Sequence, residues 1–371
     1  MSDPTSVRAL ESSTDGAGQR TAIAVDLETA YGTRRNLAWS AAMALAWKEL
    51  VRLAGGPIAL AGPDDTGAAI ARALNASAVD RNVVDEASCV ARAGLQTADF
   101  LQELRGEITQ KLGDASPRYV PDEPAPDLFI AYALLQKRLA FEVPLLRASW
   151  PFYFQGTFVQ SFGLWHRDPA EWAARAGQVR VHHPCYTEAD VERMTDAEQD
   201  AMYDEFMVEL ITKQASDRLI VASLRRGDTL GATVERAMSF LDRHAADHPH
   251  AQLGKLEKLE IPILDLDLAR RYGELYGRAV ENRQLAGQRI GEVVERVRFR
   301  LDEGGALLDA EAMGRGLGLP PRELVFNGPF FVMVLRRGAR LPMFALWVDN
   351  PEVMVQVEEP EELRAMKKRP V

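Results

Sequence analysis

The spacing of hydrophobic residues predicts helices in the first third of the chain. Apolar residues recur at helical intervals through 21–53 and again through 64–113. Asp65 or Thr66 is placed to cap one helix of the second segment, and Thr97 is placed to cap another. We therefore expect a helix-rich start to the fold.

The pattern changes to that of β-strands after a proline-rich linker at 117–126. Apolar and aromatic runs suited to buried strands follow, at LFIAYALLQ, RASWPFYFQGTF, VRVHHP, EFMVELITK, RLIVASLRRGD and LEKLEIPILDLDL. A short helix is predicted at Thr233–Leu241, between two of these runs. The remainder of the chain should therefore be dominated by sheet.

The segment Glu292–Asp302 alternates clearly and predicts a strand with two unlike faces. One face carries Val293, Glu295, Val297, Phe299 and Leu301, and the other carries Arg296, Arg298 and Arg300. Because side chains alternate across a strand, we expect the first face to be half-buried and the arginine face to be solvated.

A glycine-rich stretch separates this strand from two further strands. The stretch reads GGALLDAEAMGRGLGLPPREL, and the strands after it read FFVMVLRR and PMFALWV. A loop of about 20 residues between core strands is uncommon in a compact domain and is usually functional. The loop is therefore the first candidate for a functional element.

Composition and charge narrow the function classes. The 371 residues are 47% hydrophobic and 26% charged, as in a globular protein, and the formal net charge is −10. An acidic chain has no general attraction for nucleic acid or for an anionic membrane surface, so we expect neither partner. With two cysteines and no apolar leader, the sequence favours a cytoplasmic location without a disulfide framework.

No catalytic or metal-binding motif stands out. The chain contains no GxSxG, GK[ST] phosphate loop, HExxH or CxxC. His182 and His183 are adjacent and would point to opposite faces of a strand, while His244 and His248 precede Pro249 in a segment that reads as a helix end. We therefore expect no enzyme activity, no metal and no cofactor.

The loop and its flanks carry a family resemblance. EVVERVRFRLDEGGALLDAEAM followed by LVFNGPFFVMVLRRGARLPMFALWVDNP resembles the carboxy-terminal portion of a serpin, with the reactive loop between the two segments. NLAWSAAMALA, DLFIAYALLQK, FYFQGTF and LEIPILDLDLARRYGEL resemble further serpin segments. The resemblance is to a divergent, prokaryotic-type serpin with a shortened middle region.

The resemblance implies a mixed α+β fold, with helices packed around a large central sheet, two smaller sheets and an exposed loop. It implies a flexible tail at 1–20, one domain at 21–353 with its reactive loop at about 303–325, and a carboxy-terminal extension at 354–371. The implied function is inhibition of a serine or cysteine protease by a monomer whose loop is cleaved and then inserts into the central sheet. The alternative is a non-inhibitory serpin-fold protein that binds or regulates a partner.

Particular residues take serpin roles if the resemblance holds. The scissile bond would be Gly318-Leu319, and loop specificity would rest on Arg315, Gly316 and Leu317. The hinge that enters the sheet first would comprise Glu303, Gly304, Gly305, Ala306, Leu308, Ala310 and Ala312. Alternation places the last four of these inward, and Leu308 is larger than the alanine usual there.

Departures from the serpin pattern concern the region that controls sheet opening, for which we single out Ser40, Phe158 and Glu295. Ser40 fits the buried hydrogen-bonding cluster of the family, whereas Glu295 stands where a histidine is usual and Phe158 where a tryptophan is common. Only residues 138–151 separate DLFIAYALLQK from FYFQGTF, so we expect the helix that covers the sheet in serpins to be absent or relocated.

Overall fold

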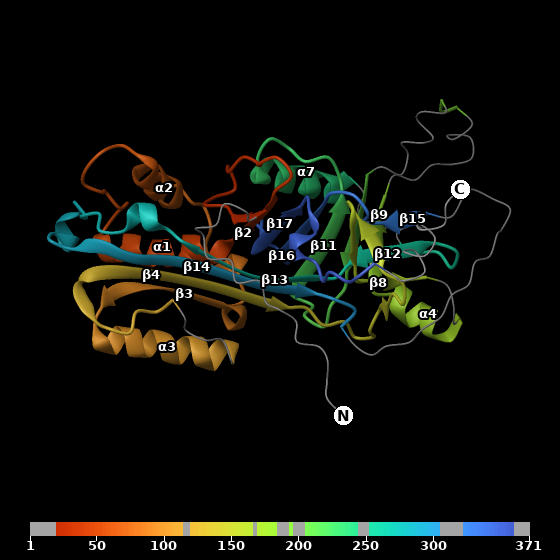
Figure 1. Cartoon of the computed structure of the whole chain (residues 1–371), viewed down its shortest axis with the longest axis horizontal. Coiled ribbons are helices and arrows are strands. Elements are labelled where there is room, and N and C mark those ends of the chain that lie inside the picture. Colours follow the sequence, from red (N-terminus) through yellow and green to blue (C-terminus); the bar gives the residue numbers. More distant parts are fainter. Residues whose placement is uncertain are drawn as a thin grey trace.

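The strands of the protein form two large sheets, one small sheet and a separate hairpin. The structure, a computed structural model, describes residues 20–113, 119–165, 169–183, 193–195, 205–243, 252–304 and 322–359. Within these ranges the sheets have seven, four, four and two strands. Figure 1 shows one four-stranded sheet extending as a long layer along the molecule, with helices on both of its faces.

The long four-stranded sheet, which we call the central sheet, has the order β13-β14-β4-β3. Its strands are β3 (Cys89–Gln96), β4 (Ala125–Arg138), β13 (Leu264–Arg271) and β14 (Arg289–Leu301). The outer pairs are antiparallel, while β4 and β14 in the middle are parallel. We call this parallel contact the seam.

The seven-stranded sheet has the order β1-β2-β17-β16-β11-β10-β9. Its strands are β1 (Thr21–Ile23), β2 (Asn36–Ser40), β9 (Val179–His182), β10 (Phe206–Leu210), β11 (Asp217–Ser223), β16 (Phe330–Arg336) and β17 (Phe344–Val348). Every residue of β2, β10 and β17 is buried, which explains why their sequences are mostly apolar and do not alternate; the polar exceptions are Asn36, Ser40 and Glu209. β2 pairs with β17, so the sheet joins an early segment of the chain to a late one.

The remaining strands form the small sheet and the hairpin. The small sheet is β15 (Glu323–Val325), β12 (Lys258–Pro262), β8 (Ser161–Leu164) and β5 (Leu146–Arg147), in that order, and the hairpin is β6 (Phe152–Phe154) with β7 (Thr157–Val159). FYFQGTF therefore forms the hairpin, and DLFIAYALLQK forms β4 of the central sheet. The two segments belong to different sheets because the chain turns away between them at 139–145.

Helices form where the sequence supplies caps and one apolar face. They are α1 (Ala41–Ala54), α2 (Thr66–Asn75), α3 (Ala98–Leu112), α4 (Pro169–Ala176) and α7 (Leu230–Arg243). Single 3-10 turns occur at Arg81–Val83, Glu86–Ser88, Gly273–Leu275, Arg283–Leu285 and Pro351–Val353. The predicted caps Asp65 and Thr97 accept hydrogen bonds from the backbone N–H groups of Ala68 and Phe100.

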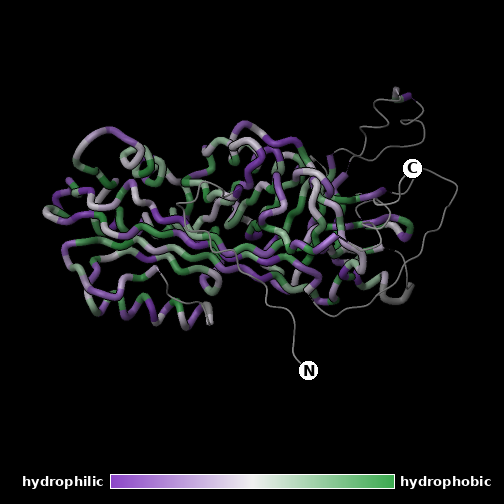
Figure 2. The backbone as a smooth tube through the Cα atoms, viewed as in Figure 1, coloured by the Kyte–Doolittle hydropathy of each residue, from purple (hydrophilic) through white to green (hydrophobic). Residues whose placement is uncertain are grey.

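Two hydrophobic cores lie on opposite faces of the central sheet. The larger contains α1 and continues into the seven-stranded sheet, where the rings of Phe299 on β14 and Phe344 on β17 stack with centroids 4.6 Å apart. The smaller places Leu104 of α3 with Tyr132 of β4 and Val294 of β14. Figure 2 shows apolar residues along the strands inside the molecule and hydrophilic residues along the outer side of α3.

Three predictions from the sequence are wrong in detail. The stretch 21–53 is not wholly helical, because β1 and β2 precede α1 and the helix begins only after Ser40. The stretch 64–113 contains β3 between its helices. The arginine face of β14 is not fully solvated, since Arg296 is only 8% exposed and pairs with Asp267.

The predicted helix at Thr233–Leu241 is confirmed within α7. A helix also covers the outer face of the central sheet, but it is α3, which precedes β4; no helix forms at 138–151. None of the helices in the described ranges is long and apolar enough to span a membrane.

Candidate functional site

A buried carboxyl group sits beneath the seam. Glu295 of β14 accepts a hydrogen bond from Ser40 Oγ at 2.7 Å on one oxygen and from Tyr272 Oη at 2.9 Å on the other. Glu295 is 1% exposed. We call Ser40, Tyr272 and Glu295 the Glu295 cluster. Because each oxygen has one donor, the geometry suits an ionised carboxylate.

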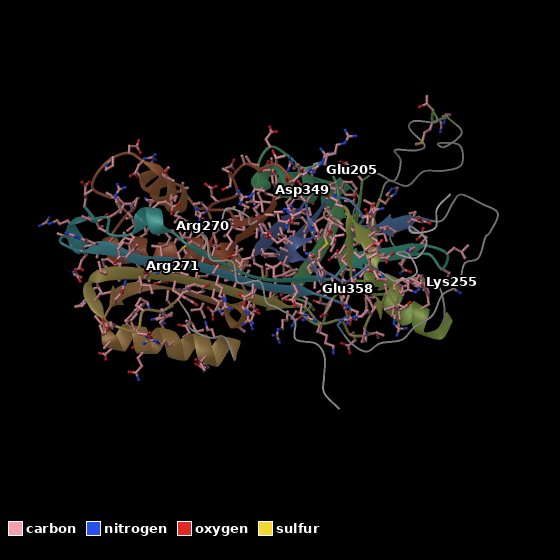
Figure 3. The ribbon with its side chains drawn as sticks, in the orientation of Figure 1. Glu205, Lys255, Arg270, Arg271, Asp349 and Glu358 are labelled. Atoms are coloured by element: carbon pink, nitrogen blue, oxygen red, sulfur yellow. The ribbon has the colours of Figure 1, made fainter. Side chains whose placement is uncertain are left out.

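The elements around Glu295 hold it in place. Ser40 is the N-cap of α1, where its Oγ also accepts from the Ala42 N–H at 3.3 Å, so the same hydroxyl links α1 to β14. Tyr272 follows β13, and the guanidinium of Arg270 lies over its ring at 4.4 Å. Arg270, labelled in Figure 3, also donates to the Ile23 carbonyl in β1. The cluster therefore joins the central sheet to α1 and β1.

Burial dominates the electrostatics of the cluster. Removal from water raises the pKa of Glu295 to about 7, and the hydrogen bonds from Ser40 and Tyr272, with the charge of Arg270, offset only part of this effect. The pKa of Tyr272 is also raised, chiefly by burial and then by the neighbouring Glu295 charge. Glu295 is thus the buried group of the central sheet that titrates near neutral pH.

The seam is paired along almost the whole of β14. The register runs from Arg289 opposite Leu128 to Arg300 opposite Arg138, with one irregularity between Ile290 and Val293. Helix α1 contacts β3, β4 and β14 on one face, and α3 packs on the other. The two middle strands of the sheet are therefore in contact and covered on both sides.

The predicted loop begins at an anchored residue. The Glu303 carbonyl accepts from the Leu145 N–H at 3.1 Å, and its carboxylate forms an ion pair with the Arg147 guanidinium at 2.8 Å. Gly304 has φ +64° and donates from its N–H to Asp302 Oδ1 at 2.8 Å, which fixes the turn that ends β14. The chain thus leaves the central sheet tied to β5 of the small sheet.

The structure brings together some of the residues predicted from sequence and separates others. Ser40 and Glu295 are hydrogen-bonded to each other. Phe158 is not part of this cluster: it lies on β7, where its ring packs against Tyr153 at 5.3 Å. Glu303 and Gly304 are described. The other predicted loop residues lie outside the described ranges, namely Gly305, Ala306, Leu308, Ala310, Ala312, Arg315, Gly316, Leu317, Gly318 and Leu319.

Sequence reasoning did not identify Tyr272 and Arg147. Neither stands in a motif, and each meets its partner only through tertiary structure, across the turn from β13 to β14 for Tyr272 and between two sheets for Arg147. The start of the predicted carboxy-terminal extension is also engaged: Val357 N donates to the Phe158 carbonyl at 2.9 Å, and Met354 forms a bridge with Leu264.

The described histidines and acids do not form a metal site. Within the described ranges, no group of three or more His, Cys, Asp or Glu side chains is arranged to hold an ion. His182 on β9 instead lies with its Nε2 3.6 Å from Glu209 Oε2 on β10. Burial acts to raise the pKa of Glu209, but His182 and Arg218 outweigh it and lower that pKa to about 2. His244 and His248 lie outside the described residues.

Comparison with solved structures identifies the fold. No family model and no curated protein sequence matches the chain. Serpin-12 of Manduca sexta, a serine protease inhibitor, matches over 86% of this chain and 94% of its own, with TM-score 0.50 and 14% identity. Human thyroxine-binding globulin (11% identity, 86% and 93% coverage, TM-score 0.47) and uncleaved ovalbumin (10%, 86% and 94%, 0.48) are also similar. The mixed α+β fold predicted from the sequence is confirmed: this chain has a serpin-like fold.

Proposed function

We propose that the protein inhibits a serine or cysteine protease by presenting 303–325 as bait and inserting the cleaved loop at the seam. The observation that carries this proposal is the parallel pairing of β4 with β14, directly upstream of the loop. Every other pair in the central sheet is antiparallel. The seam is thus a site at which a strand of opposite direction can be added.

Topology makes insertion favourable. A segment that leaves the end of β14 and turns back runs antiparallel to β14, and therefore also antiparallel to β4. Its insertion would replace one parallel pair by two antiparallel pairs, which are more stable per residue and add a second row of backbone hydrogen bonds. The free energy of the inserted state should consequently lie below that of the native state, which is then kinetically trapped.

The loop has sufficient length. At about 3.3 Å per residue, the 14 residues at 305–318, which precede the proposed scissile bond, can extend over roughly 46 Å, while the 13 residues of β14 span about 43 Å. Alternation places Ala306, Leu308, Ala310 and Ala312 toward the core, whereas a shift by one residue would bury Asp309 and Glu311 without partners. One register is therefore strongly preferred.

The residues around the proposed scissile bond indicate the class of target protease. A scissile bond at Gly318-Leu319, preceded by Leu317 and Gly316, suits a protease with a shallow or apolar primary pocket rather than a trypsin-like enzyme. Arg315 stands upstream of that bond. We infer a cytoplasmic, monomeric inhibitor of this kind.

The second candidate is a non-inhibitory binding or regulatory protein whose loop is cut without inserting. The anchor at Glu303 and the pairing of the seam along almost the whole of β14 favour it, because both must be broken before a strand can enter. Leu308 adds bulk at an inward position. Competition between these costs and the gain of antiparallel pairing decides between the two functions.

One experiment separates the two without knowledge of the target. The loop is nicked by limited proteolysis within 305–321, and the Tm is measured before and after. We expect a large rise for the parent chain and for Asp309→Arg, whose side chain faces solvent in both states. Ala310→Arg should remain at the native Tm, because an unpaired guanidinium would have to be buried.

The two variants introduce arginine at adjacent positions, and Asp309→Arg changes the net charge by +2 while Ala310→Arg changes it by +1. The larger charge change thus falls on the variant that should still insert, so surface charge alone cannot explain the expected difference. Equal native Tm values before cleavage show that neither variant is misfolded. An unchanged Tm in the cleaved parent chain supports the binding-protein alternative. A rise in both variants keeps insertion but refutes this register.

A further inference from the structure

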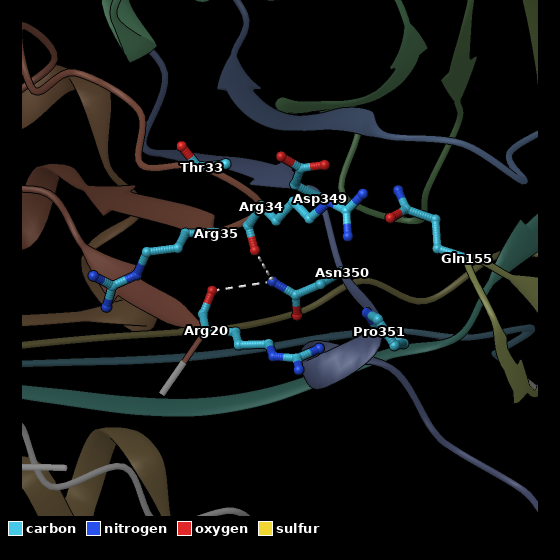
Figure 4. Close-up of a pocket in the computed structure, with 8 residues that line it drawn as sticks. All are labelled: Arg20, Thr33, Arg34, Arg35, Gln155, Asp349, Asn350 and Pro351. Carbon is cyan, nitrogen blue, oxygen red and sulfur yellow. Dashed lines mark hydrogen bonds between the residues drawn. The ribbon is translucent and has the colours of Figure 1, made fainter. Parts of the chain in front are cut away.

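A second candidate site lies at the end of the seven-stranded sheet where β2 begins and β17 ends. It is a cavity of about 300 Å³ that also reaches the tip of the β6–β7 hairpin (Figure 4). Its walls are Arg20, Thr33, Arg34, Arg35, Gln155, Asp349, Asn350 and Pro351. It is made by residues that play no part in the seam, the Glu295 cluster or the loop.

Buried amides fix the floor of this cavity. Asn350 donates from Nδ2 to the carbonyls of Arg20 and Arg34, at 3.1 Å in both cases, and Figure 4 shows it between these two residues. Asn36, fully buried, accepts from the Asp349 and Asn350 N–H groups at 2.7 and 2.9 Å. The backbone that carries the two arginines is therefore held by hydrogen bonds rather than by the arginine side chains.

Strain is concentrated at the same place. Among the described residues, the only two non-glycine residues with positive φ are Arg34 at +51° and Gln155 at +43°, and both line the cavity. A left-handed conformation costs a residue with a side chain of order 1 kcal/mol or more, and such costs gather at functional sites. At Gln155 the positive φ belongs to the two-residue turn Gln155-Gly156 of the β6–β7 hairpin, whereas at Arg34 it sets the wall of the cavity itself.

The charge of the cavity is the reverse of the charge of the chain. Three arginines line it in a protein of net charge −10. No described carboxylate forms an ion pair with the guanidinium of Arg20 or Arg34, while the acid of the rim, Asp349, already has Arg226 at 3.6 Å. Glu352 lies behind the wall, where it accepts from the Arg20 N–H and from Thr21 Oγ.

We propose that this cavity binds a small anion bearing a phosphate group, held by Arg20 and Arg34. Guanidinium groups match the geometry of phosphate oxygens, and the amide of Gln155, toward which Arg34 extends in Figure 4, supplies a further donor. A cavity of this size fits a compact anion, whereas a long polyanion would meet Asp349 on the rim. The site is independent of the proposed inhibitory function.

The test is a titration of the intact protein with inorganic pyrophosphate and, separately, with glycerol 3-phosphate, at constant ionic strength. Calorimetry gives Kd, and the rise in Tm with ligand checks it. We expect saturable binding of at least one probe, weakened about tenfold by Arg20→Gln and by Arg34→Gln. Preference for pyrophosphate indicates a free anion, and preference for the ester indicates an organic phosphate. Arg340→Gln, in the turn before the other end of β17, is the matched control and should bind within about twofold of the parent.

Arg34→Gly provides a second measurement that does not depend on affinity alone. It should lose binding as Arg34→Gln does, yet have the higher Tm of the two, because glycine adopts positive φ without strain. Absence of saturable binding of both probes in the parent, or equal weakening by Arg340→Gln, would overturn the proposal. A Tm of Arg34→Gly below that of Arg34→Gln would overturn the argument from strain.

Discussion

At the scale of single residues, Glu295 is the group whose ionisation bears most directly on the central sheet. Sequence alternation already placed it on the apolar face of β14, and the structure confirms its burial. Its partner Tyr272 could not be predicted, because the contact depends on how the chain returns from β13. The alternation of the sequence thus reveals that a carboxyl group is buried, but not which side chains donate hydrogen bonds to it.

Glu295 should make stability depend on pH in an unusual direction. Its folded pKa of about 7 lies above the ordinary 4.5, so the folded state holds its proton more tightly than the unfolded state. The stabilising contribution is complete below pH 4.5 and is lost as the pH rises through 7, by roughly 3 kcal/mol in all. Glu295→Gln has no such titration. We expect the stability of the parent chain relative to Glu295→Gln to fall over this pH range in urea unfolding.

The matched control is Glu292→Gln, three residues earlier on β14, where the carboxylate pairs with Arg271 near the surface. Glu292→Gln should not reproduce the pH dependence of Glu295→Gln. Stability of the parent chain that rises relative to Glu295→Gln over the same pH range would show that the carboxylate is stabilised by its hydrogen bonds more than it is penalised by burial.

At the scale of elements, the sequence predicts the helices and strands that have one apolar and one polar face. It does not predict correctly the strands that are buried on both faces. Strand β14 and helix α7 show clear periods, and Asp65 and Thr97 begin helices at the expected positions. Strand β2 is buried on both faces, so its apolar run merges into the apolar face of α1 and reads as one helix. The short apolar run that forms the hairpin β6–β7 predicts a strand but does not say with which strand it pairs.

The anchor between β5 and the start of the loop should control how fast the loop can move. If the cleaved loop inserts, Glu303 must leave Arg147, whose guanidinium is held at 2.8 Å. Arg147→Gln removes the ion pair from the native state and leaves the inserted state unchanged. We therefore expect the heat-stable form to appear after cleavage faster by a factor of roughly three to five, as judged from samples taken over time.

Arg147→Lys retains the charge and serves as the control, with a rate nearer that of the parent chain. Slower conversion in Arg147→Gln than in the parent would mean that the pair guides the hinge rather than restraining it. The native Tm of each variant, measured before cleavage, separates this effect from a general loss of stability.

At the scale of the whole molecule, the seam lies between the two hydrophobic cores. Helix α1 covers it on one face and α3 on the other, so separation of β4 from β14 requires movement of both cores. The sequence predicted the existence of the central sheet, through the resemblance that it carries. It could not predict that the two middle strands pair along almost their whole contact, because pairing is set by tertiary contacts.

A reversible lock across the seam tests the role of this pairing. Gln136 and Arg298 face each other in the register, and their side chains are hydrogen-bonded at 2.8 Å. Paired strands lie about 4.8 Å apart, within the range of about 4.4–6.8 Å between Cα atoms that a disulfide spans. In a Cys185→Ser background, oxidised Gln136→Cys/Arg298→Cys should show no rise in Tm after loop cleavage.

Reduction of the same cleaved sample should restore the rise, so each preparation is its own control. Either single cysteine variant should behave like the parent chain under both conditions. A rise in Tm in the oxidised double variant would show that stabilisation after cleavage does not involve separation of β4 from β14.

The pairing of β2 with β17 has a consequence for how the protein is made. Phe344 of β17 lies opposite Ser40 of β2, so roughly 300 residues separate partners in one sheet. At about 5–20 residues per second of synthesis, β2 leaves the ribosome roughly 15–60 s before its neighbour exists. Throughout that interval a strand that is fully buried in the folded protein has an open edge. The nascent chain must therefore be shielded by a chaperone, or by its own α1, until translation is almost complete.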